Sequence, residues 1–167
     1  MTVREQCKKL YKDAFGESTE FDKMLFDMFF KNIKFLQTDG AVAAMYFKIP
    51  CALNLNGVKR KAYYIYAVTT HRDFRHRGLM SKLFAETQTE SDAFYFLKPS
   101  SEGVIEFYKQ AGFRQITGTR NPCEAKIEVS DYFKALSSLC DKPQCEYPLM
   151  IKGNADIEKL NFEYTLE

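Results

Sequence analysis

Residues 68–83 read VTTHRDFRHRGLMSKL, and this stretch decides the fold because three kinds of local structure meet in it. An apolar strand pattern ends before His71, a loop with three arginines follows, and a helical pattern starts at Gly78. The first turn of a helix has backbone N–H groups without partners and carries the positive end of the helix dipole. Gly78 has no Cβ, so an anion can approach the backbone closely. We therefore expect a phosphate site in this strand–loop–helix context.

The segment differs from the familiar nucleotide-binding loops, because the chain has neither a GxxxxGK[ST] nor a GxGxxG pattern. Both histidines of the chain, His71 and His76, lie in this segment. With two histidines and no CxxC pair among the five cysteines, we expect no metal site. Reduced, mostly structural thiols in a cytoplasmic protein are the expected state of the cysteines.

The segments on either side of the loop predict a βαβ unit. Residues 58–69 are rich in Tyr, Val and Ile and predict a long strand. Residues 79–87 place their apolar side chains on one helical face, and residues 93–97 form a short apolar run. Strand, helix and strand at this spacing predict a parallel pair with a right-handed crossover.

Further from the loop, the patterns predict elements of both kinds. On the N-terminal side they predict a helix at 3–14 and a second helix after a cap by Ser18 or Thr19. A hairpin follows at 33–49 around Asp39-Gly40, and Asn56-Gly57 predicts a second tight turn. On the C-terminal side they predict a helix at 102–111 that ends at Gly112. Strands are predicted at 113–119 and 123–129, and a further helix at 130–140.

The composition bounds the class of protein. The 167 residues are 46% hydrophobic and 28% charged with a mean hydropathy of −0.36, which is typical of one globular domain and excludes a disordered chain. Lys and Arg number 24 against 22 Asp and Glu, and a net charge of +2 disfavours a nucleic-acid partner. No run approaches the ~20 apolar residues of a membrane span. We expect a single domain over residues 1–167, with its motif core at 58–119 and the segment 120–167 unassigned.

The spacing Arg75-x-x-Gly78-x-Met80 resembles the acyl-CoA-binding motif of the GNAT superfamily of N-acyltransferases, although most members have Gly or Ala where Met80 stands. Three further segments resemble the family in the same order: YIYAVTTH at 64–71, KPSSE at 98–102 and FYKQAGF at 107–113. Together the matches cover residues 58–114. The Arg-x-Arg-Gly-Leu-Met and Ser-Glu-Gly elements most resemble the enhanced-intracellular-survival branch, whose members are often longer, so its substrates are not transferred.

The resemblance implies an α/β (α+β) fold, the single-domain GNAT fold. Its central sheet is mixed and mostly antiparallel, contains a parallel strand pair that splays apart, and is flanked by helices. The implied co-substrate is acetyl-CoA, whose pantetheine arm would pair with the strand edge while its phosphates lie on the loop and helix start. The cofactor-binding residues implied by the resemblance are Ala67, Val68, Thr69, Thr70, Arg75, His76, Arg77, Gly78, Leu79, Met80 and Ser101.

Tyr108 matches the family tyrosine that protonates the departing thiolate. A phenol has a pKa of ~10 and a thiol of ~8.5, so Tyr108 would be protonated at neutral pH and suited to act as a general acid. The backbone N–H of Val68 would hold the oxyanion. The general base stays open between water relayed through residues such as Tyr66 and a carboxylate such as Glu102.

The implied activity is transfer of an acetyl group to a primary amine by direct attack in a ternary complex, the acceptor being a small molecule or a peptide. Four acidic residues near the first two helices would attract a cationic amine, or simply be solvated: Glu17, Glu20, Asp22 and Asp27. The alternative is a non-catalytic sensor or scaffold that keeps the fold and binds CoA. The oligomeric state is open, with a homodimer as one option.

Overall fold

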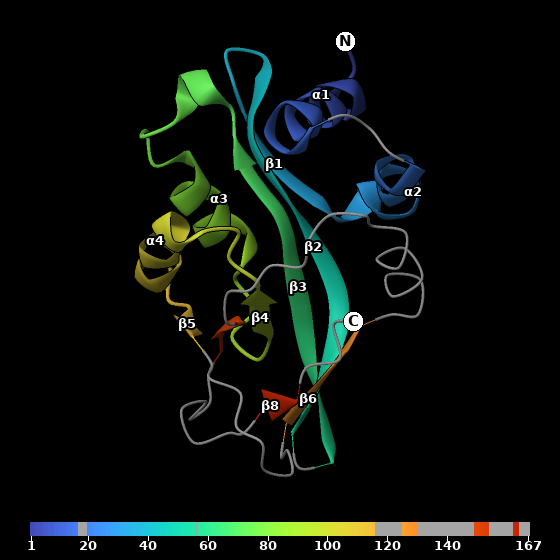
Figure 1. Ribbon diagram of the computed structural model, residues 1–167, viewed down its shortest axis with the longest axis vertical. Coiled ribbons are helices and arrows are strands. Elements are labelled where there is room, and N and C mark those ends of the chain that lie inside the picture. Colours follow the sequence, from blue (N-terminus) through green and yellow to red (C-terminus); the bar gives the residue numbers. More distant parts are fainter. Residues whose placement is uncertain (17–19, 56, 116–124, 130–148, 154–161, 164–167) are drawn as a thin grey trace. The chain divides into compact units, whose positions relative to one another are not determined.

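The computed structural model describes residues 1–16, 20–55, 57–115, 125–129, 149–153 and 162–163 (Figure 1). The chain divides into two compact units. The first unit comprises Met1–Ile49 and Ile65–Thr89, and the second comprises Pro50–Tyr64 and Glu90–Glu167.

Two helices open the first unit. Helix α1 (Val3–Phe15) starts with a capping box, in which the Glu5 N–H donates to Thr2 Oγ1 and the Thr2 N–H donates to the Glu5 carboxylate. It ends at Gly16, whose φ of 98° only glycine adopts readily. Helix α2 (Glu20–Phe29) follows, and a single 3₁₀ turn (Phe30–Asn32) leads into the strands. The predicted helix at 3–14 is confirmed, whereas the predicted caps Ser18 and Thr19 lie outside the described residues.

The predicted hairpin is present. Strands β1 (Ile33–Thr38) and β2 (Ala41–Leu55) pair antiparallel, from Ile33 opposite Phe47 to Thr38 opposite Ala41. The turn residues Asp39 and Gly40 have φ angles of 53° and 77°, as an Asp-Gly hairpin turn requires. Of the second predicted turn, Gly57 has a φ of 81° and Asn56 lies outside the described residues.

The central strand and helix of the predicted βαβ unit follow. Strand β3 (Val58–Thr70) leads through a 3₁₀ turn (Arg72–Phe74) to helix α3 (Leu79–Thr87), whose bounds are those predicted. Figure 1 shows the strands of the first unit passing between α1 and α2 on one side and α3 on the other. Helix α3 buries Leu83 and Phe84, and the Phe84 ring packs edge-on against Tyr46 of β2 at 5.2 Å.

The second unit contains the parallel pair. Strand β4 (Phe94–Leu97) pairs parallel with β3, from Ala62 opposite Phe94 to Tyr64 opposite Phe96, as predicted. Tyr64 and Phe96 stack at 5.2 Å with their planes 14° apart. On its other edge β4 pairs antiparallel with β7 (Met150–Lys152), which pairs with β5 (Arg114–Gln115). A 3₁₀ turn (Glu102–Val104) and α4 (Ile105–Gln110) occupy the predicted helix at 102–111.

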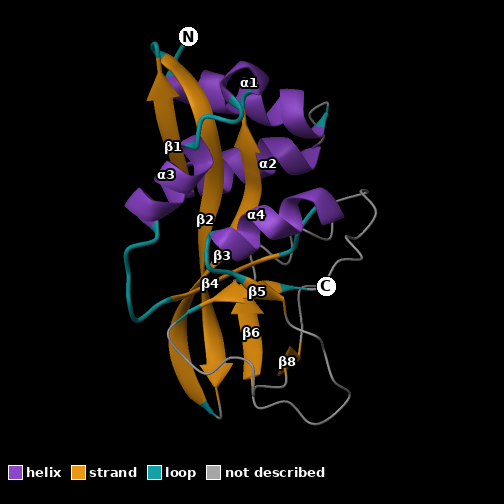
Figure 2. Cartoon of the chain, turned by 90° about the vertical axis from the view of Figure 1, so that its left-hand side faces the viewer, coloured by secondary structure: helices purple, strands orange, loops and turns teal. Residues whose placement is uncertain are grey.

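The sheet confirms the expected fold class. Its strand order is β5-β7-β4-β3-β2-β6-β8. Strand β1 pairs with β2, and Figure 2 shows these two strands side by side. Strand β6 (Ala125–Val129) lies within the predicted strand at 123–129 and pairs antiparallel with β2, and β8 (Phe162–Glu163) pairs parallel with β6. The predicted helix at 130–140 and residues 116–119 of the predicted strand at 113–119 lie outside the described residues. No pattern predicted β7.

In the described ranges, none of the helices has the length and apolar content that a membrane-spanning helix needs.

Candidate functional site

Strand β3 changes its backbone conformation at Ala67, where the predicted pantetheine edge begins. Ala67 has a φ of 53°, a left-handed conformation that costs a residue with a Cβ roughly 1–2 kcal/mol. Strained backbone of this kind persists where the surrounding structure imposes it, and it is concentrated at functional sites. Pairing with β4 ends at Tyr64 opposite Phe96, but β3 continues to Thr70. Val68 and Thr70 are half-buried and Thr69 is buried on this continuation.

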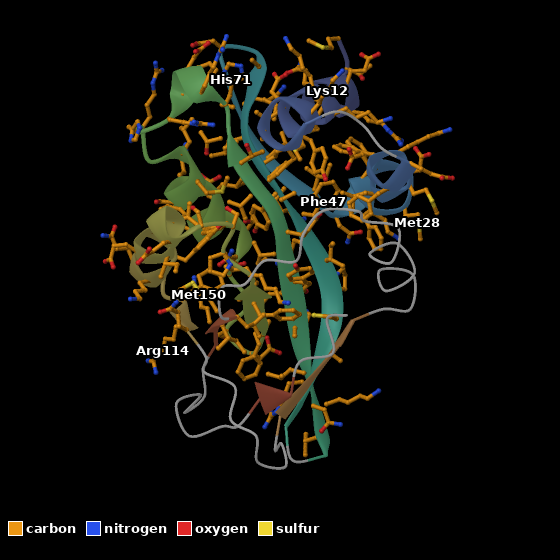
Figure 3. The ribbon with its side chains drawn as sticks, in the orientation of Figure 1. Lys12, Met28, Phe47, His71, Arg114 and Met150 are labelled. Carbon is orange, nitrogen blue, oxygen red and sulfur yellow. The ribbon has the colours of Figure 1, made fainter. Side chains whose placement is uncertain are left out.

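The loop after β3 is fixed at both ends by hydrogen bonds. The His71 N–H donates to the Ala43 carbonyl at 2.7 Å, which ties the loop to β2, and Figure 3 shows His71 at this end of β3. The Phe74 N–H donates to the His71 carbonyl at 2.9 Å and closes the 3₁₀ turn. Arg75 Nε donates to the Thr70 carbonyl at 3.2 Å, so the loop is held on both sides of the turn.

The backbone of residues 76–80 is shaped to receive an anion. His76 and Gly78 have φ angles of 61° and 68°, and such left-handed residues turn successive N–H groups toward one point. Within the described ranges, no backbone acceptor takes the N–H groups of residues 76–80, and the first bond of α3 runs from the Lys82 N–H to the Gly78 carbonyl at 3.0 Å. No side chain caps α3 at Gly78. This arrangement fits a pyrophosphate.

Two arginines beside these N–H groups carry charge that no carboxylate of the described residues neutralises. Arg75 and Arg77 are exposed, and the Arg77 guanidinium lies 5.2 Å from the centre of the Phe74 ring. Arg72, the third arginine of the loop, instead has Nε 3.7 Å from Asp73 Oδ1. The loop thus presents two positive side chains next to the donors of residues 76–80.

The side chain of Met80 does not occupy this surface. It is 6% exposed and packs in the core on the same face of α3 as Leu83 and Phe84. The departure from the Gly or Ala of most family motifs therefore leaves the N–H groups uncovered. Leu79 is half-buried and His76 is exposed, so His76 offers its backbone at the site.

Tyr108 and Ser101 belong to the second unit, whereas the other predicted site residues belong to the first. Tyr108 lies on α4, is 7% exposed, and has its ring 5.4 Å from Phe107 and 6.0 Å from Phe113. This burial raises the pKa of Tyr108 above its ordinary value, so its phenol is neutral at physiological pH. Ser101 is exposed and immediately precedes the 3₁₀ turn that leads into α4.

One polar cluster was missed as a unit at the sequence level. Tyr11 on α1 and Asp22 on α2 are 2% and 4% exposed, and Tyr11 interacts with both Asp22 and Tyr66 of β3. A signal was present, because Asp22 shares a helical face with the apolar residues Leu25 and Phe26. A carboxylate in such a face has to be buried. Asp27, by contrast, is exposed and pairs with Arg4 at 2.6 Å.

The described ranges contain no group of three or more His, Cys, Asp or Glu side chains placed to share a metal ion.

Comparison with known proteins agrees with this geometry. A family model described as an acetyltransferase (GNAT) domain matches residues 2–116. A search among curated protein sequences gives no match.

Three solved structures illustrate the likeness in fold. A conserved protein of unknown function from Enterococcus faecalis V583, described as a probable N-acyltransferase, is 22% identical with a TM-score of 0.57, over 67% of this chain and 30% of its own. Naa50 of Arabidopsis thaliana, in complex with the bisubstrate analogue CoA-Ac-MVNAL, is 14% identical with a TM-score of 0.57, over 90% and 91%. The GNAT family N-acetyltransferase YhbS of Escherichia coli, in complex with CoA, is 15% identical with a TM-score of 0.59, over 97% and 83%. The present chain thus spans about 30% of the length of the Enterococcus protein.

Proposed function

Since the chain belongs to the GNAT acetyltransferase domain family, we propose that it transfers an acetyl group from acetyl-CoA to a primary amine by direct attack in a ternary complex. The observation that carries the proposal is the anion-binding backbone of residues 76–80. Its donors have no backbone acceptor within the described ranges, and beside them stand Arg75 and Arg77, which no carboxylate of the described residues pairs with. A site of this design suits a ligand with two or more phosphates.

The first unit supplies the residues for binding acetyl-CoA. The pantetheine arm would hydrogen-bond to the backbone of Ala67, Val68 and Thr69, on the part of β3 that has no partner in β4. The pyrophosphate would accept hydrogen bonds from the N–H groups of residues 76–80. Arg75 and Arg77 would contact the phosphates, including the 3′-phosphate of the adenosine. Solved relatives bound to CoA or to a CoA-containing analogue support a co-substrate of this class.

The proposed chemistry forms a C–N bond and breaks the thioester C–S bond. The neutral amine attacks the thioester carbonyl, and the oxyanion that develops would accept a hydrogen bond from the Val68 N–H. From the family resemblance we assign Tyr108 as the general acid, whose hydroxyl would donate its proton to the thiolate of CoA as the C–S bond breaks. Burial keeps Tyr108 protonated at neutral pH, which suits a general acid.

We propose a small molecule or a peptide with a primary amine as the acceptor. The Arabidopsis relative was solved with an analogue that joins CoA to a peptide, which keeps peptide amines among the candidates. The Arg-x-Arg-Gly-Leu-Met and Ser-Glu-Gly segments favour the enhanced-intracellular-survival branch. We place the reaction in the cytoplasm, where Cys7 and Cys51, which form no disulfide, would stay reduced.

Calorimetry with acetyl-CoA and a thiol-release assay test the proposal together. The amine panel consists of spermidine, kanamycin, free lysine and the peptide Met-Val-Asn-Ala-Leu. The wild type should bind acetyl-CoA and release free thiol only when an amine is present. Failure to bind acetyl-CoA at millimolar concentration would sink the proposal, and binding without turnover on any amine would favour a sensor or scaffold.

The variant Tyr108→Phe isolates the general acid. It should keep acetyl-CoA affinity and lose about 100-fold in kcat, the usual contribution of a positioned acid. Tyr46→Phe is the matched control, because Tyr46 is also a buried tyrosine but its hydroxyl contacts Thr87 Oγ1 at 2.6 Å. If both variants lose activity equally, Tyr108 has no special role.

A further inference from the structure

The three arginines of the loop before α3 are held in three different ways. Arg72 lies beside a carboxylate at 3.7 Å, and Arg75 Nε donates to a backbone carbonyl at 3.2 Å. Arg77 has neither kind of partner among the described residues. Its guanidinium lies over the ring of Phe74 instead, with Cζ 5.2 Å from the centre of the ring.

The contact between Arg77 and Phe74 leaves the donors of the guanidinium available. A cation within ~6 Å of the centre of an aromatic ring is attracted to the face of that ring. Because a guanidinium is planar, its face can lie against a ring while its N–H groups point outward along its edge. A phosphate accepts hydrogen bonds from that edge. Arg77 can therefore keep its contact with Phe74 and bind an anion at the same time.

The Phe74 ring is itself held in place. Phe74 ends the 3₁₀ turn, and its N–H donates to the His71 carbonyl at 2.9 Å. His71 is tied to β2 by the 2.7 Å hydrogen bond from its N–H to the Ala43 carbonyl, and Figure 3 shows it at the end of β3. The His71 and Phe74 rings lie 5.6 Å apart with their planes inclined by 59°. A half-buried ring with these contacts is a fixed support for a long side chain.

The supported guanidinium belongs to a residue that also offers its backbone to the anion. Arg77 is one of residues 76–80, whose N–H groups form the proposed pyrophosphate site, and it immediately precedes Gly78. Its side chain is exposed, and an unsupported arginine there would have to be ordered when the ligand binds. Ordering a long side chain at that moment lowers the affinity. The contact with Phe74 orders Arg77 before the ligand arrives.

We propose that Phe74 is a positioning residue for acetyl-CoA binding, which holds the Arg77 guanidinium on its ring so that the N–H edge meets a phosphate of the co-substrate. This inference rests on the proposed function, because it concerns the same acetyl-CoA site. Phe74 acts through Arg77 and does not contact the ligand. The pattern Arg75-x-x-Gly78-x-Met80 does not include this aromatic residue.

A double-mutant cycle on Phe74 and Arg77 tests the proposal, with acetyl-CoA affinity measured by calorimetry. Phe74→Leu keeps an apolar side chain and removes the ring, so it should weaken binding about two- to fivefold, the range of an exposed cation–π contact. In the Arg77→Gln background the same substitution should change the affinity little, because the guanidinium that the ring supports is absent. Phe74→Tyr keeps the ring and should bind acetyl-CoA as the wild type does.

Phe35→Leu is the matched control. Phe35 of β1 belongs to the same unit, is 38% exposed and is not part of the proposed site, so its substitution should leave the affinity unchanged. Thermal unfolding of each variant without ligand checks that it is folded. If Phe74→Leu does not fold, Phe74→Met takes its place in the cycle.

Three results would overturn the positioning role of Phe74: no loss of affinity in Phe74→Leu, an equal loss in the wild-type and Arg77→Gln backgrounds, or a loss in Phe74→Tyr as large as in Phe74→Leu. Wild-type binding and turnover would leave the proposed function intact in each case. Wild-type binding without turnover on any panel amine would reject the enzymatic activity, and the cycle would still decide the role of Phe74. Absence of acetyl-CoA binding to the wild type would overturn both proposals.

Discussion

Ala67 has a left-handed backbone conformation that its Cβ disfavours. Its φ of 53° suits glycine or asparagine, and an ordinary side chain is strained there. We predict that Ala67→Val lowers the free energy of unfolding by about 1–2 kcal/mol, because a β-branched side chain tolerates this conformation least. Urea unfolding of the two proteins measures the difference.

Ala67→Asn is the matched control for that prediction. Asparagine adopts the left-handed conformation more readily than valine, so its free energy of unfolding should stay close to that of the wild type. Equal losses for Val and Asn would mean that the cause is the volume of the side chain at position 67 and not its backbone conformation.

For single residues, the sequence predicted a special backbone conformation only where the residue type itself favours it. Gly78 was expected to bring the backbone close to a ligand, and its φ of 68° is one that glycine permits. The same conformation at Ala67 was not foreseeable, because alanine has no local preference for it and the surrounding sheet imposes it. Asp22 and Tyr66 were each candidates, but their link through Tyr11 depends on packing between three elements that are distant in sequence.

At the scale of the elements, the three arginines of the loop before α3 should differ in their contribution to acetyl-CoA binding. We predict that Arg75→Gln and Arg77→Gln each weaken acetyl-CoA binding about tenfold, because a charge-assisted hydrogen bond to phosphate is lost. Arg72→Gln should change the affinity little, since Arg72 lies beside Asp73 and is not in the proposed contact set. Calorimetry at two salt concentrations measures the affinities, and an equal effect of all three variants would indicate a diffuse charge effect and not specific contacts.

The capping box of α1 predicts a dependence of stability on pH. The hydrogen bond from the Thr2 N–H lowers the pKa of Glu5 below its ordinary value. A lowered pKa in the folded state stabilises the fold above the unfolded pKa of ~4.3, and the effect is lost as the pH falls through the folded value. Relative to Glu5→Gln, the wild type should be more stable at pH 7 and equal to the variant at low pH.

Unfolding in urea at a series of pH values measures that difference. A difference between wild type and Glu5→Gln that does not change with pH would show that the charge of Glu5 plays no part in the cap.

The elements that the sequence predicted correctly are those with strong local patterns. The helix at 79–87 has an apolar face, and the hairpin at 33–49 has an Asp-Gly turn between two apolar runs. Strand β7 was not foreseeable, because its three residues are too few for a pattern and it forms by pairing with β4 and β5. Its formation is a tertiary effect.

For the whole molecule, ligand binding and unfolding are coupled. We predict that acetyl-CoA at 100 times its dissociation constant stabilises the protein by about 2.7 kcal/mol and raises Tm by roughly 5–10 °C. The net charge of +2 predicts no comparable shift with duplex DNA at physiological salt. Differential scanning calorimetry measures both, and a shift with DNA but not with acetyl-CoA would contradict the prediction.

The end of the pairing between β3 and β4 has a consequence for self-association. A strand edge with free N–H and C=O groups is a template on which a second chain can add its own strand, and aggregation grows from such edges. Ala67 interrupts the extended backbone at the start of this edge, which hinders the regular ladder that an added strand would need. The same left-handed residue would leave room for the proposed pantetheine arm, and we expect it to hinder the addition of a strand from a second copy.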